Sequence, residues 1–491
     1  MARPSLDDYF GDWKRREALA QEMIPMIGKL ESEKSVGIFL YGRTLSNRSV
    51  ASIMKSHRRV RQVGRNELSE FESHPVLQAM AKLNLSPCKV DLGKLTVGFM
   101  EQSGSDGEIL DVDDYVAREL APLVGVDYQP IPRPTDIVLY GFGRIGRLIT
   151  RLLLEQTGAG KVMRLRAIVI RKNGEGDIEK RVNLLRHDSV HGSFEGTVRV
   201  DEENSRIIAN GNVIHMIHAE RPDNIDYTQY GITDALIIDN TGRWRDQEGL
   251  SQHLQSKGVS KVLLTAPGKG DLKNIVYGIN HDSIRQDDRI ITAASCTTNA
   301  IAPVLRLLHD KYGVAHGHVE TVHAYTNDQN LIDNFHKADR RGRSAALNMV
   351  LTETGAAKAV AKAVPELAGR LTGNAVRVPV ANVSMAILNL SLDKETTAAE
   401  LNDYFRNIAL YSPLQNQIGY TESPDAVSSD FIGSREASIL DATATKADGR
   451  HCVLYLWYDN EFGYSSQVVR MLNKMAGVKF LSYPENEGMD N

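Results

Sequence analysis

A glycine-rich turn between an apolar strand and an amphipathic helix places the tightest limit on how this chain folds. Residues 136–140 (DIVLY) predict a buried strand, residues 141–146 read GFGRIG, and residues 147–154 (RLITRLLL) have the apolar spacing of a helix. The apolar residues 165–170 predict the next strand. A strand, a crossover helix and a second strand form the βαβ unit of a parallel sheet, so we expect an α/β fold.

The three glycines of this turn predict a dinucleotide site. Gly141 permits the tight turn, Gly143 lets a pyrophosphate approach the backbone, and Gly146 lets the helix pack closely on the strand. The free N–H groups at the start of the helix then face the phosphates. The predicted cofactor-binding loop consists of Gly141, Phe142, Gly143, Arg144, Ile145 and Gly146.

The end of the second strand departs from the usual pattern of such sites. An acidic residue normally stands there and binds the 2′-hydroxyl of the adenosine ribose. This chain has Arg171 and Lys172 instead. Because these cations attract a 2′-phosphate that a carboxylate would repel, we expect NADP to be used at least as well as NAD. The alternative is that both are solvated loop cations without a ligand.

One of the three cysteines has the surroundings of a nucleophile. Cys296 lies in ASCTTNA (residues 294–300), directly before a predicted helix at residues 301–308. The helix dipole is expected to lower the pKa of this thiol and to raise its thiolate fraction. Cys88 and Cys452 lack such polar surroundings and are expected to be buried and inert. A thiol nucleophile also needs a base, but spacing alone does not single out one of the 14 histidines.

A run of alternating prolines divides the chain. Residues 129–134 (QPIPRP) oppose both helix and sheet, so we place a domain boundary there. Upstream, apolar patterning predicts helices near residues 19–30, 76–83 and 112–123, and strands at residues 36–41 and 94–100. Pro25 is expected to end or kink the first helix. Residues 1–130 therefore predict a small α/β unit.

Composition sets limits on location and partners. The net charge of −4 and the pI of about 6.4 argue against a dedicated nucleic-acid binder. An odd, low number of cysteines fits a reducing compartment. No signal peptide and no run of about 20 apolar residues is found, so we expect a cytoplasmic protein that does not enter membranes. We predict no metal site.

Taken in order, the motifs between residues 136 and 476 resemble the glyceraldehyde-3-phosphate dehydrogenase family. They are GFGRIGR (141–147), HDSVHG (187–192), ASCTTN (294–299), TVHAYTNDQ (321–329), TGAAK (354–358), RVP (377–379), VSSDF (427–431) and WYDNEFGY (457–464). The resemblance implies a Rossmann-type dinucleotide-binding domain at residues 135–295 and 460–480. It implies an α+β catalytic domain at residues 296–459 and a polar tail at residues 481–491. The unit at residues 1–130 lies outside the resemblance and has no assigned role.

The resemblance also implies a reaction of glycolysis and gluconeogenesis. Cys296 would attack the aldehyde of glyceraldehyde 3-phosphate, and His323 would act as the base. After hydride transfer to NAD or NADP, inorganic phosphate would cleave the thioester to give 1,3-bisphosphoglycerate.

Further residues are assigned by their positions in the family motifs. Those expected at the two phosphate sites are Ser295, Thr297, Thr326, Asp328, Arg343, Thr354 and Arg377, with Asp328 orienting Arg377. Those expected at the cofactor are Thr241, Thr265, Asn460 and Tyr464, with Asn460 at the nicotinamide carboxamide. The resemblance also implies a homotetramer. Asn334 and Phe335 stand where NAD-preferring members tend to have Leu-Pro, near a ribose of the neighbouring subunit, which strengthens the NADP hypothesis.

Two other functions stay open at this point. One is a dehydrogenase for a longer sugar phosphate such as erythrose 4-phosphate, although Thr326 and residues 354–357 favour the triose phosphate. The other is a regulatory or RNA-binding protein that has kept the fold. The feature that suggests this second alternative is the basic cluster at residues 55–61 (KSHRRVR) of the N-terminal unit.

Overall fold

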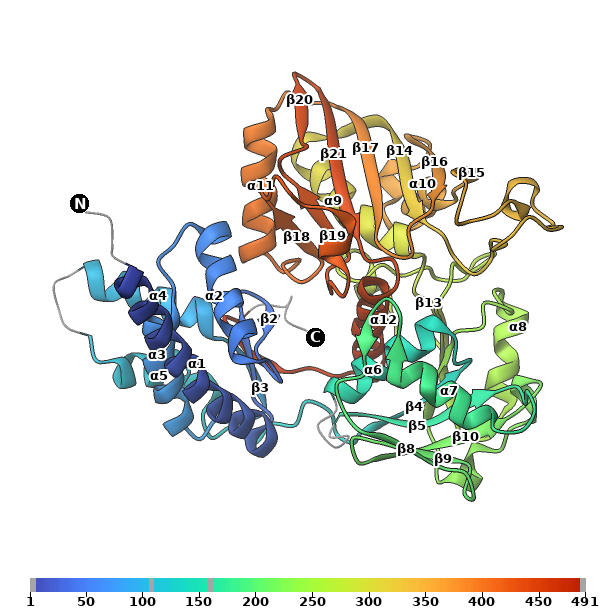
Figure 1. Ribbon diagram of the computed structural model, residues 1–491, viewed down its shortest axis with the longest axis horizontal. Coiled ribbons are helices and arrows are strands. Elements are labelled where there is room, and N and C mark those ends of the chain that lie inside the picture. Colours follow the sequence, from blue (N-terminus) through green and yellow to red (C-terminus); the bar gives the residue numbers. More distant parts are fainter. Residues whose placement is uncertain (1–5, 106–109, 157–161, 486–491) are drawn as a thin grey trace. The chain divides into compact units, whose positions relative to one another are not determined.

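The computed structural model describes residues 6–105, 110–156 and 162–485, and its contacts divide the chain into two compact units (Figure 1). The first unit consists of residues 1–132, 406–416 and 479–490, and the second of residues 133–405, 417–478 and 491. The division between Pro132 and Arg133 falls within the proline run. Each unit is described separately below.

The first unit is a small α/β fold with its own apolar core. Its sheet has the strand order β2-β1-β3-β22 and is covered by helices. The strands are β1 (Gly37–Leu40), β2 (Arg43–Thr44), β3 (Cys88–Asp91) and β22 (Leu481–Tyr483). The helices are α1 (Leu6–Lys34), α2 (Val50–Gly64), α3 (Glu70–Lys82), α4 (Leu92–Ser105) and α5 (Val112–Glu119). The predictions of an α/β unit and of a strand near residues 36–41 are confirmed.

One local prediction in this unit was wrong. Residues 94–100 form part of helix α4 rather than a strand, because Leu92, Leu95 and Thr96 are buried at helical spacing. Pro25 was expected to end or kink the first helix, and it does not end it, because helix α1 continues to Lys34. Pro25 lies on its exposed face, where water can satisfy the carbonyl that loses its partner.

The segment expected to be a polar tail is partly structured. Residues 481–483 form β22, which pairs in parallel with β3 in the register Leu481 to Cys88 and Tyr483 to Val90. The hydroxyl of Tyr483 lies 3.3 Å from a carboxylate oxygen of Glu119. The strand was not predicted because it has only three residues and lies in a segment that is otherwise polar. Residues 486–491 of the predicted tail lie outside the described residues.

The second unit contains the predicted Rossmann-type sheet. Its order is β13-β12-β11-β4-β5-β10-β9-β8, parallel from β13 to β10 and antiparallel from β10 to β8. The strands are β4 (Thr135–Tyr140), β5 (Met163–Ile170), β8 (Val198–Asp201), β9 (Arg206–Ala209), β10 (Asn212–His218), β11 (Ala235–Asp239), β12 (Val259–Leu264) and β13 (Ile290–Thr292). Helices α6 (Arg144–Gln156) and α12 (Phe462–Ala476) pack side by side on it.

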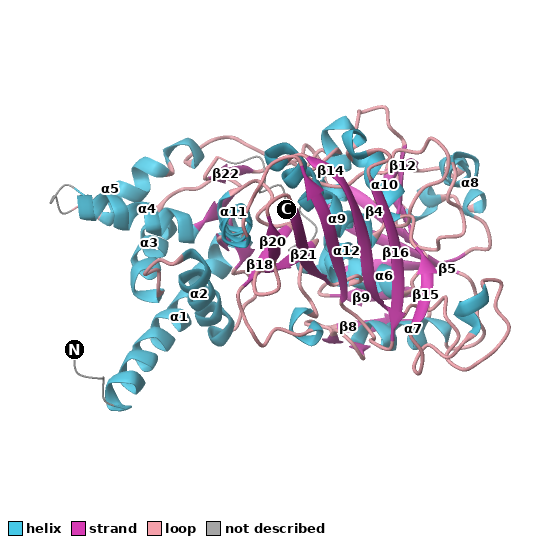
Figure 2. Cartoon of the chain, turned by 90° about the horizontal axis from the view of Figure 1, so that it is seen from above, coloured by secondary structure: helices cyan, strands magenta, loops and turns pink. Residues whose placement is uncertain are grey.

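A second sheet carries the remaining predicted site. Its order is β15-β16-β14-β17-β21-β19-β18, with β20 beside β21, and its long strands run side by side in Figure 2. The strands are β14 (Val314–Ala324), β15 (Val350–Glu353), β16 (Leu371–Val378), β17 (Ser384–Leu392), β18 (Ile418–Thr421), β19 (Ser438–Asp441), β20 (Lys446–Asp448) and β21 (His451–Tyr458). Helix α9 (Cys296–Tyr312) packs on this sheet. The other helices in this part of the chain are α7 (Asp177–Arg186), α8 (Gln247–Ser251), α10 (Ala356–Ala363) and α11 (Ala398–Tyr411). The α+β character expected for this part is confirmed.

Candidate active site

The predicted nucleophile and base lie together. Cys296 is the first residue of α9, and His323 is the penultimate residue of the long strand β14. The Sγ of Cys296 is 3.6 Å from the Nε2 of His323, within hydrogen-bonding distance for sulfur. The two residues reach each other because α9 packs on the sheet that contains β14.

The surroundings of His323 favour one tautomer. Its Nδ1 is 2.7 Å from the carbonyl oxygen of Ala324 and 3.1 Å from the Nη1 of Arg377. We place the proton on Nδ1, donated to the carbonyl at the shorter distance, and Arg377 then donates to that carbonyl and to Thr326. Nε2 then presents a lone pair to the thiol. Burial, followed by the positive charge of Arg377, lowers the pKa of His323 to about 4. His323 is therefore neutral near pH 7 and ready to accept a proton.

The expected thiolate is not favoured in the protein alone. Burial raises the pKa of Cys296, although Arg377 and Thr297 act in the opposite direction. The prediction that the helix dipole lowers this pKa was wrong, because desolvation of the sulfur outweighs the dipole. The resting pair is a neutral thiol beside a neutral imidazole. The other two thiols are buried and free, and burial raises the pKa of Cys88 to about 12 and of Cys452 to about 11.

Arg377 supplies an anion-binding group beside this pair. It lies on β16 opposite His323 on β14. Its Nη1 donates to the hydroxyl of Thr326 at 3.0 Å and to the carbonyl of Ala324 at 3.1 Å. The buried Nε of Arg377 has no hydrogen-bond partner among the described residues. A guanidinium with a free donor beside a hydroxyl is chemically suited to a phosphate.

Asp328 has a different partner from the one expected. Its carboxylate accepts from the hydroxyl of Thr326 and forms an ion pair with Arg341. Its influence on Arg377 is through space, where its charge raises the pKa of a guanidinium that burial lowers. Arg341, which sequence reasoning missed, therefore adds a second cation near Thr326.

Three of the expected hydroxyl residues lie at helix starts. The side chain of Ser295 caps α9 by accepting from the backbone N–H of Thr298 at 3.0 Å. Thr297 is buried, and its hydroxyl is 3.0 Å from that of Tyr458. Thr354 precedes α10, and its hydroxyl accepts from the backbone N–H of Ala356 at 3.2 Å.

Arg343 does not join this cluster. Its side chain is about two-thirds exposed, and its Nε donates to Asp333 at 2.8 Å. Both residues lie in the segment between β14 and β15. The structure therefore brings together Cys296, His323, Thr326 and Arg377 and leaves Arg343 outside.

The glycine loop has the geometry of a dinucleotide site. It joins β4 to α6, as predicted. A Cβ atom on Gly146 would lie 2.6 Å from the carbonyl oxygen of Gly141, so this close approach requires glycine. A Cβ on Gly143 would meet no atom within 4 Å, which leaves open space where a pyrophosphate is expected. Phe142 is buried in the core of this sheet, and Ile145 packs partly against the same core.

Other expected cofactor residues lie at the same edge of the sheet. Thr241 follows β11, and Thr265 follows β12. The hydroxyl of Thr241 donates to Asp239 at 2.7 Å, and that of Thr265 donates to the carbonyl of Asp239 at 3.1 Å. Arg171 and Lys172 follow β5 and are exposed.

Asn460 and Tyr464 extend the site toward the catalytic pair. Asn460 is buried, and its side-chain oxygen accepts from the hydroxyl of Ser384 at 2.8 Å. The hydroxyl of Ser384 in turn accepts from the backbone N–H of Ala324 at 3.1 Å, next to His323. The hydroxyl of Tyr464 donates to the carbonyl of Ala294 at 2.9 Å and fixes the turn before the nucleophile.

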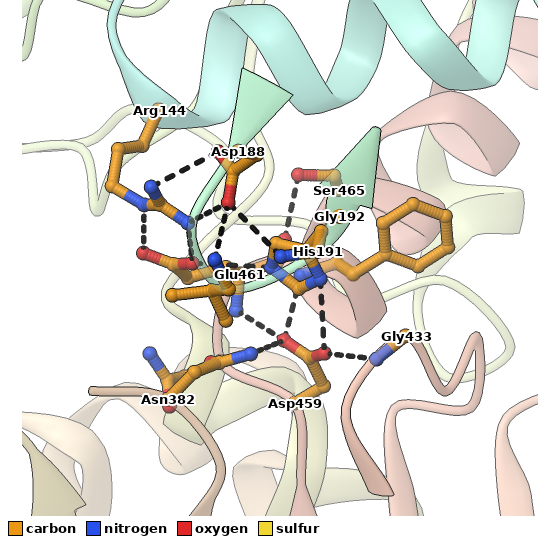
Figure 3. Close-up of polar contacts among 12 residues, drawn as sticks. Arg144, Asp188, His191, Gly192, Asn382, Gly433, Asp459, Glu461 and Ser465 are labelled. Carbon is orange, nitrogen blue, oxygen red and sulfur yellow. Dashed lines mark hydrogen bonds and ion pairs between the residues drawn. The ribbon is translucent and has the colours of Figure 1, made fainter. Parts of the chain in front are cut away.

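A network of charged side chains connects the glycine loop to the segment that holds Asn460 (Figure 3). The guanidinium of Arg144 contacts Glu461 at 2.5 Å and Asp188 at 3.1 Å. His191 lies 3.2 Å from the same Glu461 carboxylate. Arg144 was expected to bind the cofactor, but the contacts of its side chain are with these carboxylates.

The residue before Asn460 anchors this network. One carboxylate oxygen of Asp459 accepts from the backbone N–H groups of Glu461 and Phe462 and from the amide of Asn382. The other accepts from the backbone N–H of Gly433 at 2.8 Å. These four contacts hold the loop on both sides of Asn460.

Two general features of the described residues complete the picture. Across residues 6–105, 110–156 and 162–485, no helix has the length and apolar character needed to cross a membrane. Within the same ranges, no group of three His, Cys, Asp or Glu side chains is arranged to hold a metal ion.

Comparison with known proteins decides the family. Residues 135–247 match the NAD binding domain of glyceraldehyde 3-phosphate dehydrogenase, and residues 295–460 match its C-terminal domain. The chain belongs to the glyceraldehyde-3-phosphate dehydrogenase family. It is 41% identical over 343 residues to the glyceraldehyde-3-phosphate dehydrogenase of Pseudomonas aeruginosa PAO1, covering 70% of this chain and 98% of that protein. It is also 41% identical over 358 residues to the chloroplastic form A of Zea mays, covering 72% and 86% of the two chains.

The N-terminal unit occurs in at least one other member of the family. A glyceraldehyde-3-phosphate dehydrogenase-like protein of Pseudomonas aeruginosa UCBPP-PA14 is 57% identical over 464 residues, covering 94% of this chain and all of that protein. The family matches themselves begin at residue 135. The extra unit is therefore a shared feature of a longer form.

Sequence reasoning missed three residues at the dehydrogenase site: Arg341, Ser384 and Tyr458. Tyr458 stands inside the quoted WYDNEFGY motif, so the motif itself carried a signal for it. Ser384 reaches the site through the pairing of β17 with β21, and Arg341 reaches it from the segment between β14 and β15 through its contact with Asp328. No local pattern marks either residue.

Proposed function

We propose that this protein is a phosphorylating glyceraldehyde-3-phosphate dehydrogenase that converts glyceraldehyde 3-phosphate into 1,3-bisphosphoglycerate. The observation that carries the proposal is the 3.6 Å contact between Cys296 and His323, beside Arg377, whose Nε has no partner among the described residues. A thiol, a neutral base and an unsatisfied guanidinium are the groups that oxidation of a phosphorylated aldehyde through a thioester needs.

The proposed cycle follows from these positions. His323 takes the thiol proton at Nε2 as the sulfur of Cys296 attacks the aldehyde carbon. His323 returns that proton to the oxygen of the adduct, which gives the thiohemiacetal, and takes it back from the hydroxyl as the carbon loses a hydride and becomes a thioester. When bound, the oxidised nicotinamide accepts that hydride, and its positive charge stabilises the thiolate. Phosphate attacks the thioester, which releases the acyl phosphate and returns the sulfur as the leaving group.

We assign the substrate phosphate to Arg377 and Thr326, with Arg341 nearby through Asp328. The attacking phosphate is assigned to Ser295 and Thr354, whose hydroxyls lie at the starts of α9 and α10. Arg343 would serve this second site only after its pair with Asp333 opens.

The cofactor of this proposal is NADP or NAD, held by the glycine loop, Thr241, Thr265 and Asn460. Arg171 and Lys172 follow β5 and are exposed where an acidic residue is usual, which supports NADP. The free Cys296 thiol must stay reduced to react, which fits a cytoplasmic enzyme.

We further propose a homotetramer. The segment between β14 and β15, with the start of β15, exposes large apolar side chains whose exposed fractions run from 55% to 91%. They are Leu331, Ile332, Phe335, Leu347, Met349 and Leu351. Exposed apolar patches of this kind mark protein–protein interfaces. Sedimentation of the wild type and of Phe335→Asp tests this proposal, and a monomeric wild type would contradict it.

The deciding assay follows nicotinamide reduction with glyceraldehyde 3-phosphate, with and without phosphate, using NAD and NADP in parallel. We expect phosphate-dependent reduction that disappears in Cys296→Ala, and a preference for NADP that falls in Arg171→Ala. Faster reduction with erythrose 4-phosphate than with glyceraldehyde 3-phosphate would show that the longer sugar phosphate is the preferred substrate. Reduction with neither aldehyde would overturn the proposal.

A further inference from the structure

A hollow of about 310 Å³ opens on the Rossmann-type sheet away from the catalytic pair. It is lined by Arg164, Arg166, Asn212 and His215, together with the intervening backbone. Arg164 is the second residue of strand β5, and Asn212 is the first residue of β10, which runs parallel to β5. The glycine loop follows the last residue of the parallel strand β4, so the hollow and the cofactor loop lie at opposite edges of the sheet.

The hollow contains more positive than negative charge. Arg164 and Arg166 share one carboxylate, that of Asp136, at 2.7 and 3.6 Å. Arg206 on β9 stands opposite His215 on β10, and its buried Nε has no hydrogen-bond partner among the described residues. The carboxylate of Asp136 is therefore shared by two guanidinium groups, and a third guanidinium, that of Arg206, lies near His215.

The other carboxylate near Arg206 is already engaged. Asp201 stands opposite Arg206 on β8, and both of its oxygens accept from the side-chain amide of Asn204. It therefore has less capacity to satisfy Arg206.

The pKa of His215 is lowered by burial and in part by the positive charges around this hollow. Burial lowers the pKa of its imidazole, and the charges of Arg206 and Arg166 lower it further. The ring of Tyr230 lies 5.0 Å from that of His215, and the carbonyl of Tyr230 accepts from Arg166. No carboxylate contacts His215 among the described residues, so an anion would complete this arrangement.

We propose that the hollow is a second anion site, which binds a small phosphorylated molecule with its phosphate between Arg166 and His215, and that Arg206, which stands opposite His215, adds positive charge beside it. Guanidinium forks and an imidazole match phosphate oxygens, and the volume is at the lower end of ordinary small-molecule sites. The position across the sheet from the glycine loop makes this site separate from those of substrate and cofactor.

Binding of inorganic pyrophosphate to the full-length protein tests the proposal. Arg377→Gln removes the site assigned to the substrate phosphate, Thr354→Ala in the same background weakens the site assigned to the attacking phosphate, and saturating cofactor fills the glycine loop. Calorimetry should then still find one pyrophosphate per chain. Arg166→Gln and His215→Gln should each weaken that binding about tenfold or more. Arg221→Gln, which removes an exposed arginine elsewhere in the unit, should leave it unchanged.

A second measurement needs no variant. Pyrophosphate should slow carbethoxylation of His215 in the wild type severalfold, as followed by mass spectrometry, while the exposed His187 reacts at an unchanged rate. Loss of all pyrophosphate binding in the Arg377→Gln background, or equal reactivity of His215 with and without pyrophosphate, would overturn the second site. Neither result depends on the outcome of the dehydrogenase assay.

Discussion

The side chain of Arg144, from the glycine loop, lies 2.5 Å from that of Glu461, which directly follows Asn460. This ion pair joins the part of the site expected to hold the pyrophosphate to the part expected to hold the nicotinamide. Arg144 is about one-quarter exposed and Glu461 about one-eighth, so water screens the pair only weakly. The two ends of the cofactor site are thus positioned by one shared contact.

Replacing Glu461 should therefore weaken cofactor binding more than catalysis. In Glu461→Gln the Arg144 guanidinium loses a charged partner, which costs about 1–3 kcal/mol and corresponds to roughly a tenfold rise in the cofactor KM. We expect kcat to change less, because Cys296 and His323 are untouched. Steady-state kinetics with varied cofactor measure this split. Glu155→Gln, which removes a more exposed partner of Arg435, is the matched control and should have little effect.

Asp188 should contribute to stability in a way that acid removes. Burial opposes its ionisation, but the backbone N–H groups of His191 and Val190 and the charge of Arg144 together lower its pKa to about 2. Because the folded pKa is below the unfolded value of about 3.9, the contribution is complete above about pH 4 and is lost as the pH falls toward 2.

The Asp188→Asn variant isolates this contribution. We expect a loss of about 1–2 kcal/mol in the free energy of unfolding near pH 7 that narrows as the pH approaches 2. Denaturant unfolding at several pH values measures it. A difference between wild type and variant that is constant with pH would contradict the assigned pKa.

Alkylation should distinguish Cys296 from the other two thiols. Cys88 and Cys452 are buried with raised pKa values, so iodoacetamide should modify Cys296 alone below about pH 9. Because burial also raises the pKa of Cys296, its rate should still be rising with pH above pH 7 in the cofactor-free protein. Oxidised cofactor should move this profile to lower pH. Mass spectrometry after timed labelling identifies the site and the rate, and a flat profile would show that the thiolate is already formed.

Strand β22 should stabilise the N-terminal unit from the other end of the sequence. Ending the chain after residue 479 removes the partner of β3 and the contact from Tyr483 to Glu119, so residues 6–105 should become more sensitive to proteases. Ending it after Glu485 keeps β22 and is the control. Limited proteolysis with mass mapping compares the two chains, and equal protection would show that β22 adds no stability.

The sequence predicted well those parts of the fold that depend on the pattern of apolar residues and glycines within a short segment. The βαβ unit follows from apolar runs and three glycines. The pairing of Cys296 with His323 came from the order of family motifs, since nothing local selects one histidine. The partners of Asp328 and Arg144 depend on segments 13 and 317 residues away, which no local pattern reveals.

The errors have equally specific causes. Residues 94–100 contain residues that favour strands, but burial of Leu92 and Leu95 on one side selects the helix. The pKa of Cys296 depends on how much protein surrounds the sulfur, and that quantity is a property of the folded state. The short strand β22 has too few residues for its alternation to be recognised.

The pairing of β22 with β3 also sets an order of events during synthesis. The ribosome produces β3 early, but its neighbour β22 emerges only after residues 92–480, which include nearly all of the dehydrogenase portion, have been made. Until then, one side of β3 is an open strand edge of the kind on which chains aggregate. The N-terminal unit is consequently made before the dehydrogenase portion but completes its sheet after it, and the chain is most prone to aggregate in the interval between the two.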